Sequence, residues 1–236
     1  ESAYRERNDI EGLSLVLTRR ASAYRQMGKY EAALEHAEEV LRLTEADRKL
    51  QAAYAEALRI KGLSLFRLGH SGEAIGYLEH SLSLFNGLKD TGSIPVLLVE
   101  TGIVHAAIGD MEAASLAYQK ALKIWGKENN LASQADVLNN IGNLDHQMGE
   151  YEHAVEALDQ GLMLARKGRY PRAEALTLLS LGDIYAEVED YEAARQVYER
   201  AQPIADQWPG AFIDTYLILA RANLAGIGRA GARVRI

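Results

Sequence analysis

Residues 142–154 read GNLDHQMGEYEHA, and forty residues further on residues 182–194 read GDIYAEVEDYEAA. Two series of small residues recur at intervals of 40 or 41 residues, one with Ala21, Gly62, Gly102, Gly142 and Gly182, and one with Ala33, Ala74, Ala114, Ala154 and Ala194. Self-similarity at a period of this length is typical of stacked supersecondary units, not of a closed globular core.

Each unit carries two apolar series at helical spacing. Leu138, Ile141 and Leu144 precede Gly149, and a second series begins at Tyr151. Such spacing marks one face of a helix, and glycine permits the positive φ that ends a helix. The sequence therefore predicts an all-α fold: a right-handed superhelical solenoid of antiparallel helix pairs, with about 11–13 helices and no sheet.

The motif resembles that of the tetratricopeptide repeat family. The family pattern is met by a small residue in the first helix, a turn glycine, an aromatic two residues later and an alanine three further on, as in ASAYRQMGKYEAA at residues 21–33. Glu189 replaces the turn glycine in the fifth copy, and His105 and Asp145 replace a usual aromatic. The period of about 40 residues is long for this family. It is similar to that of the bacterial maltose-regulon activator type of transcriptional regulator, and also to that of kinesin light chains and spindle adaptors.

The period divides residues 1–236 into one array. We expect repeats at 10–50, 51–91, 92–131, 132–171 and 172–210, with 1–9 as the remnant of a preceding repeat and 211–236 as a partial sixth repeat. Native arrays end in polar capping units, and neither end of this sequence reads as one. We therefore expect a fragment of a longer protein, able to self-associate through its cut ends.

Composition and charge limit the classes of binding partner that we expect. The net charge is −7, and residues 62–165 carry 5 basic and 13 acidic side chains. Nucleic-acid binding needs a basic stripe, so no direct binding of nucleic acid by this segment is expected. With no apolar run of about 18 residues and no cysteine, we expect no membrane partner and a cytoplasmic location.

No catalytic constellation is visible. The chain has no phosphate-binding glycine loop, no nucleophile elbow and no HExxH motif, and no two histidines share a helix at zinc-ligand spacing. We therefore expect no enzyme activity, no catalytic residue, no metal and no cofactor.

Candidate binding residues lie on the predicted concave face, which the first helices of the repeats line. They form a basic set, an apolar set and a polar set: Arg19, Arg25, Arg59 and Arg67; Leu63, Phe66 and Ile103; and Asn139, Asn143 and His146. Arginine suits carboxylate or phosphate, and an asparagine amide both donates to and accepts from a peptide backbone, as related arrays use it.

Each set also has an ordinary structural interpretation. The arginines can pair with neighbouring glutamates such as Glu11, Glu31 and Glu56, the apolar residues can pack between adjacent first helices, and polar residues on an exposed face need no ligand. The resemblance implies a protein- or peptide-binding or ligand-sensing module, the regulatory segment of a larger bacterial transcriptional regulator. The alternative is a stand-alone peptide-binding scaffold of the kinesin-light-chain or spindle-adaptor type.

Overall fold

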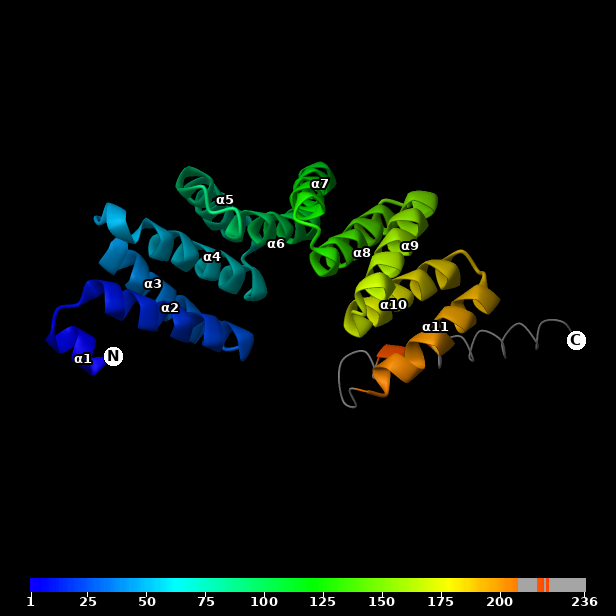
Figure 1. The fold of residues 1–236 in the computed structure, drawn as a ribbon, viewed down its shortest axis with the longest axis horizontal. Coiled ribbons are helices and arrows are strands. Elements are labelled where there is room, and N and C mark those ends of the chain that lie inside the picture. The colour runs from blue at the N-terminus through cyan, green and yellow to red at the C-terminus, as the bar shows by residue number, and fades with distance from the viewer. Residues whose placement is uncertain (208–215, 219, 221–236) are drawn as a thin grey trace, which may run out of the picture. The chain divides into compact units, whose positions relative to one another are not determined.

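A computed structural model describes residues 1–207, 216–218 and 220, and every regular element within them is helical. The chain divides into two compact units, residues 1–121 and residues 122–236 (Figure 1). The division falls inside α7 (Met111–Lys127). The all-helical repeat fold predicted from the sequence is confirmed, and each unit is described below by itself.

The first unit holds a short helix and then successive helix pairs. Its elements are α1 (Ser2–Glu6), α2 (Ile10–Gln26), α3 (Tyr30–Thr44), the 3-10 turn η1 (Arg48–Leu50), α4 (Gln51–Arg67), α5 (Ser71–Leu88), α6 (Ser93–Ala107) and the beginning of α7. In this unit α3 contacts both α2 and α4, and α5 contacts both α4 and α6.

The second unit repeats this plan. It contains the end of α7, then α8 (Leu131–Gln147), α9 (Tyr151–Gly168), α10 (Pro171–Glu187) and α11 (Tyr191–Ala205), followed by helical residues 216–218 and 220. The described helices begin and end close to the repeat boundaries given above. The division of the chain into those repeats stays a prediction. The predicted first helix of a sixth repeat and its turn glycines, Gly226 and Gly228, lie mostly or wholly outside the described residues.

Glycines set the closeness of the paired helices. A Cβ atom on Gly142 would lie 2.5 Å from Leu158 Cγ and 3.0 Å from the backbone oxygen of Ala154. Gly62 is in the same position in the first unit, with a Cβ 2.8 Å from Leu78 Cγ. These distances are shorter than van der Waals contact, so a larger residue forces the helices apart.

Left-handed residues end the first helices. Gly28, Gly69, Gly109 and Gly149 have φ between 73° and 91°, and Glu189 takes the same conformation with φ 64°. Because a Cβ is unfavourable there, the fifth turn carries a strain that the other four avoid.

Prolines lie inside α6 and α11. Pro95 lies in the first turn of α6, where its missing N–H costs no hydrogen bond within the helix. Pro203 lies inside α11, which continues to Ala205 and ends there.

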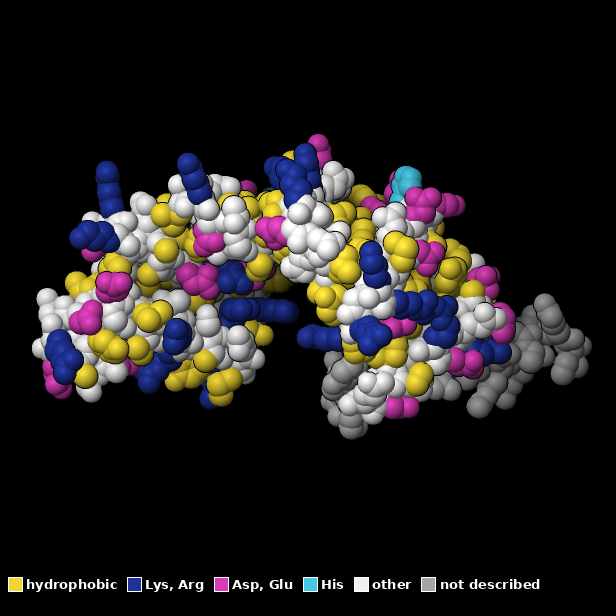
Figure 2. All heavy atoms as spheres, viewed as in Figure 1, with side chains coloured by type: hydrophobic (Ala, Val, Ile, Leu, Met, Phe, Trp, Pro, Cys, Tyr) yellow, Lys and Arg dark blue, Asp and Glu magenta, His cyan; other side chains and the backbone are white. Residues whose placement is uncertain are grey.

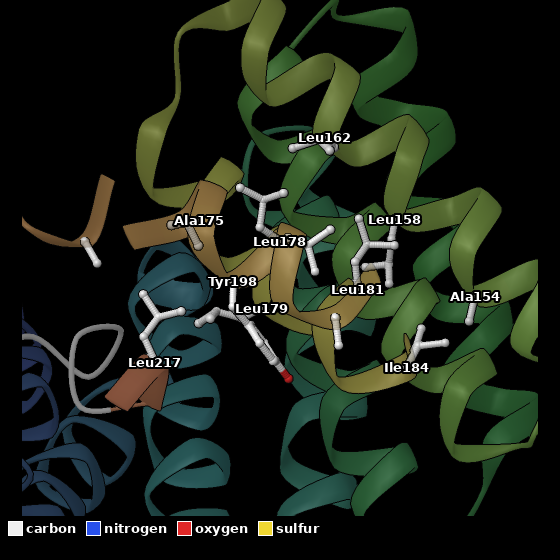
Figure 3. Close-up of a cluster of buried hydrophobic side chains, with 14 residues drawn as sticks. Ala154, Leu158, Leu162, Ala175, Leu178, Leu179, Leu181, Ile184, Tyr198 and Leu217 are labelled. Atoms are coloured by element: carbon white, nitrogen blue, oxygen red, sulfur yellow. The ribbon is translucent and has the colours of Figure 1, made fainter. Parts of the chain in front are cut away.

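The hydrophobic core runs between the helix pairs. In the second unit Leu158, Leu178 and Leu181 point toward one another, with Tyr198 beside them (Figure 3), and each is 2% exposed or less. The Tyr198 hydroxyl donates to Asp183 Oδ1 at 2.7 Å, and the Tyr216 hydroxyl donates to the other oxygen of the same carboxylate. That carboxylate ties the helical residues 216–218 to α10.

Candidate functional site: the first-helix faces

The predicted site residues all lie on first helices, on the surfaces that we call the first-helix faces: α2, α4 and α6 in the first unit, and α8 and α10 in the second. Residues about 41 positions apart meet across neighbouring first helices. Such contacts join Arg59 to Glu100 in the first unit, and Asn139 to Ser180 and His146 to Glu187 in the second.

Arg59 is held by carboxylates in the first unit. Its Nε and Nη2 donate to the two oxygens of Glu100 at 2.6 Å each, and its Nη1 donates to Glu56 at 2.9 Å. Although burial by itself lowers the pKa of Arg59, the hydrogen bonds and charge of Glu100 and Glu56 raise it above its ordinary value. This bidentate pair joins α4 to α6 and leaves the guanidinium little capacity for a ligand.

The other arginines of the first unit are placed differently. Arg19 is exposed on α2. Arg25 is half-buried, and its Nε has no hydrogen-bond partner among the described residues. Arg67 is exposed, with its guanidinium carbon 5.9 Å from the centre of the Phe66 ring. The basic set is therefore spread along α2 and α4, with Arg59 fully engaged and the rest open to a partner.

The apolar set is mostly packed. Leu63 is 9% exposed and belongs to the core cluster that joins α4, α5 and α6, and Phe66 packs against the same cluster. Ile103 on α6 is 39% exposed. For Leu63, packing between helices is thus the interpretation that the structure supports, while Ile103 offers apolar surface.

In the second unit, the position equivalent to Arg59 is occupied by Asn139. Its Oδ1 accepts a hydrogen bond from the Ser180 hydroxyl on α10 at 3.1 Å, at the same 41-residue separation as the Arg59–Glu100 pair. Asn143 is half-buried one turn further along α8. A neutral hydrogen bond thus replaces the ion pair, and the amide nitrogen of Asn139 keeps its donors.

His146 takes part in a second contact between α8 and α10. Its Nε2 lies 2.6 Å from Glu187 Oε2, and the Tyr151 hydroxyl donates to Glu187 Oε1 at 2.9 Å. The hydrogen bond from His146, with that from Tyr151, lowers the pKa of the Glu187 carboxyl, and the same carboxylate raises the pKa of Tyr151. The role of Glu187, like those of Glu100 and Ser180, becomes visible only when the 41-residue spacing is applied between repeats.

A hollow of about 390 Å³ opens between the first halves of α8 and α10. Its lining combines amides, opposite charges, one aromatic ring and small apolar residues: Ala132, Asp136, Asn139, Asn140, Tyr170, Arg172, Ala173 and Leu176. Of the predicted polar set, Asn139 lines the hollow, whereas Asn143 and His146 lie further along α8. Figure 2 shows Lys and Arg side chains gathered over α9 and α10 on the visible face of this unit.

Two further kinds of feature were sought among residues 1–207, 216–218 and 220. Among them no group of three or more His, Asp or Glu side chains is placed to hold a metal ion. None of the described helices combines the length and apolar character needed to cross a bilayer.

Comparisons with known proteins agree with the repeat geometry. The tetratricopeptide repeat family model matches residues 13–87 and 133–207, together more than half of the chain. The chain is 31% identical over 132 residues to the anaphase-promoting complex subunit cut9 of Schizosaccharomyces pombe, covering 56% of this chain and 19% of that protein. It thus spans about a fifth of the length of this curated relative.

Two solved structures share the fold. One is a signal transduction ATPase with a tetratricopeptide repeat sensor from Pyrococcus horikoshii (TM-score 0.74, 17% identity, 91% of this chain and 33% of that one). The other is a Podospora anserina protein assigned as a kinesin light chain (TM-score 0.68, 17% identity, 83% and 96%). Together with the repeated helix pairs and their crossing glycines, the family match shows that this chain belongs to the tetratricopeptide repeat family.

Proposed function

We propose that this chain is a peptide- or protein-binding module, and that the first-helix face of its second unit is the binding surface. The observation that carries the proposal is the run of amides on α8, Asn139, Asn140 and Asn143, beside a hollow. Side-chain amides can donate to a peptide carbonyl and accept from a peptide N–H at once, which suits recognition of an extended backbone.

The contrast between the units supports this choice. On the first unit the Arg59 guanidinium is occupied by two carboxylates, while on the second the equivalent residue makes one neutral hydrogen bond. An amide held by Ser180 is oriented before a ligand arrives, which lowers the ordering cost of binding. The exposed Arg19 on α2, Arg67 on α4 and Ile103 on α6 are separate groups on the first unit that suit an acidic partner.

The larger context is also a proposal. The shared fold with the repeat sensor of a signal transduction ATPase favours a regulatory segment of a larger cytoplasmic regulator, in line with the resemblance to the maltose-activator type. A stand-alone scaffold is favoured by the shared fold with a kinesin light chain. Sequence flanking this chain separates the two, because a nucleotide-binding module beside the array selects the regulator.

The test uses a displayed library of nonapeptides. Peptides enriched on the wild-type protein are synthesised with fluorescein, and their affinities are measured by fluorescence anisotropy for wild type, Asn140→Ala, Asn143→Ala and Glu156→Ala. Glu156 is exposed on the second helix α9 and serves as the control. Loss of a backbone-directed amide is expected to cost about 1–3 kcal/mol of binding free energy, with the melting temperature unchanged. Equal affinities for all four proteins would show that the face is not the site.

A further inference from the structure

Two opposite charges line the hollow without pairing. Asp136 on α8 and Arg172 on α10 lie more than 4.0 Å apart, and neither makes a hydrogen bond or ion pair within the described residues. They are nevertheless neighbours, since partial burial raises the pKa of Asp136 and the charge of Arg172 opposes that rise. Nearby, Arg166 and Glu174 do pair, at 2.7 Å.

Neither of the two positions carries a charge in every repeat, although an acidic residue, Glu56, also stands eighty residues before Asp136. Forty residues before Asp136 stands Val96, and forty after it Leu176; forty residues before Arg172 stands Ala132. The repeat therefore does not require a charge at either position. Because Ala132 and Ala173 are small, space remains between the two charged side chains, and Leu176 contributes apolar lining.

The amides of the hollow complete a polar frame. Ser180 donates to Asn139 Oδ1, which fixes the orientation of that amide and leaves its nitrogen to donate. Asn140 lies beside it and also lines the hollow. A peptide passing over α8 would thus find an amide nitrogen to donate to its carbonyl oxygen and an amide oxygen to accept from its N–H. Asp136 lies one turn earlier on the helix than these amides.

We propose that the hollow selects an extended peptide segment that carries a basic and an acidic side chain two residues apart, the basic one reaching Asp136 and the acidic one Arg172. In an extended chain, side chains two residues apart point to the same side and lie about 6.6–6.8 Å apart, which suits two protein charges too far apart to pair directly. Arginine binds carboxylates through its planar fork, and the Tyr170 ring at the rim can face the basic group. This inference rests on the proposed function, whose ligand class it specifies.

The experiment uses N-acetylated, C-amidated, fluorescein-labelled nonapeptides in an enriched library sequence. One set keeps a central basic-x-acidic pair, a second reverses its order and a third has glutamine at both positions. The protein is wild type, Asp136→Asn, Arg172→Gln, or the double charge exchange Asp136→Lys with Arg172→Glu, and Glu156→Ala is the control.

The expected result is an enrichment of such pairs in the library and an affinity at least about 10-fold higher for the paired peptide than for the glutamine peptide. Either single substitution abolishes that difference, the control keeps it, and the double exchange prefers the reversed order. If enriched peptides lose affinity with Asn140→Ala but ignore charge and Arg172→Gln, the charge inference is overturned and the proposed function stands. If no peptide binds, both are overturned.

Discussion

Replacing two glycines of one helix pair with alanine separates packing from backbone propensity. Gly62 lies within α4, where a new Cβ would be 2.8 Å from Leu78 Cγ and 3.0 Å from the backbone oxygen of Ala74. Gly76 lies within α5, where a new Cβ meets nothing within 4 Å. Both changes gain about 1 kcal/mol of helix propensity, but only Gly62→Ala carries an overpacking cost of about 1–3 kcal/mol.

The free energy of unfolding is therefore expected to rise by about 1 kcal/mol in Gly76→Ala and to fall by as much as about 2 kcal/mol in Gly62→Ala. Because the propensity gain is common to both, their difference measures the helix crossing alone. Urea denaturation followed by circular dichroism gives the two values. If both variants are equally stabilised, the crossing assigned to Gly62, and with it the register of the repeats, is incorrect.

Arg59→Ala is expected to destabilise the first unit by about 1–3 kcal/mol, because it leaves the carboxylate of Glu100 without its hydrogen-bond partner. Urea denaturation measures this change, and an unchanged free energy of unfolding would show that the ion pair contributes nothing. Glu187→Gln is expected to lower the melting temperature at neutral pH. Because the folded-state pKa of Glu187 is lowered, its contribution to stability is fully present above the ordinary pKa of 4.5 and is lost as pH falls through the folded-state pKa. The difference in melting temperature between Glu187→Gln and wild type should therefore vanish in acid. A difference that stays constant with pH would contradict the role of His146. Glu189→Gly is expected to stabilise the second unit by about 0.5–1 kcal/mol, because glycine removes the left-handed strain at φ 64°; a lower thermal midpoint would refute this reasoning.

Most of the fold follows from local sequence physics. Small residues at the crossing positions, turn glycines and two apolar faces predict the helix pairs, and Gly142 meets Leu158 and Ala154 as the spacing requires. Even the departure at Glu189 keeps the backbone of the repeat, because the flanking helices impose the left-handed turn on it. Periodicity therefore predicts backbone geometry well.

The site is less predictable, since pairing between side chains depends on neighbours one repeat away. The sequence leaves open whether Arg59 binds a ligand or pairs with a glutamate, and whether Leu63 faces a partner or packs between helices. In the structure Glu100 and Glu56 bind Arg59, and Leu63 packs in the core. Both Arg59 with Glu100 and His146 with Glu187 are pairs of residues 41 positions apart, so the signal for these contacts is the repeat period applied to polar side chains. The hollow at Asp136 and Arg172 arises from small residues beside them and has no local sequence motif.

The most direct test of the central claim is the affinity of a library-selected, fluorescein-labelled nonapeptide for Asn140→Ala compared with Glu156→Ala. If the first-helix face of the second unit holds the peptide backbone, Asn140→Ala binds about 5- to 150-fold more weakly than Glu156→Ala, while both melt at the wild-type temperature. Equal affinity for the two variants, or an unfolded Asn140→Ala protein, would contradict the claim and assign the α8 amides a structural role.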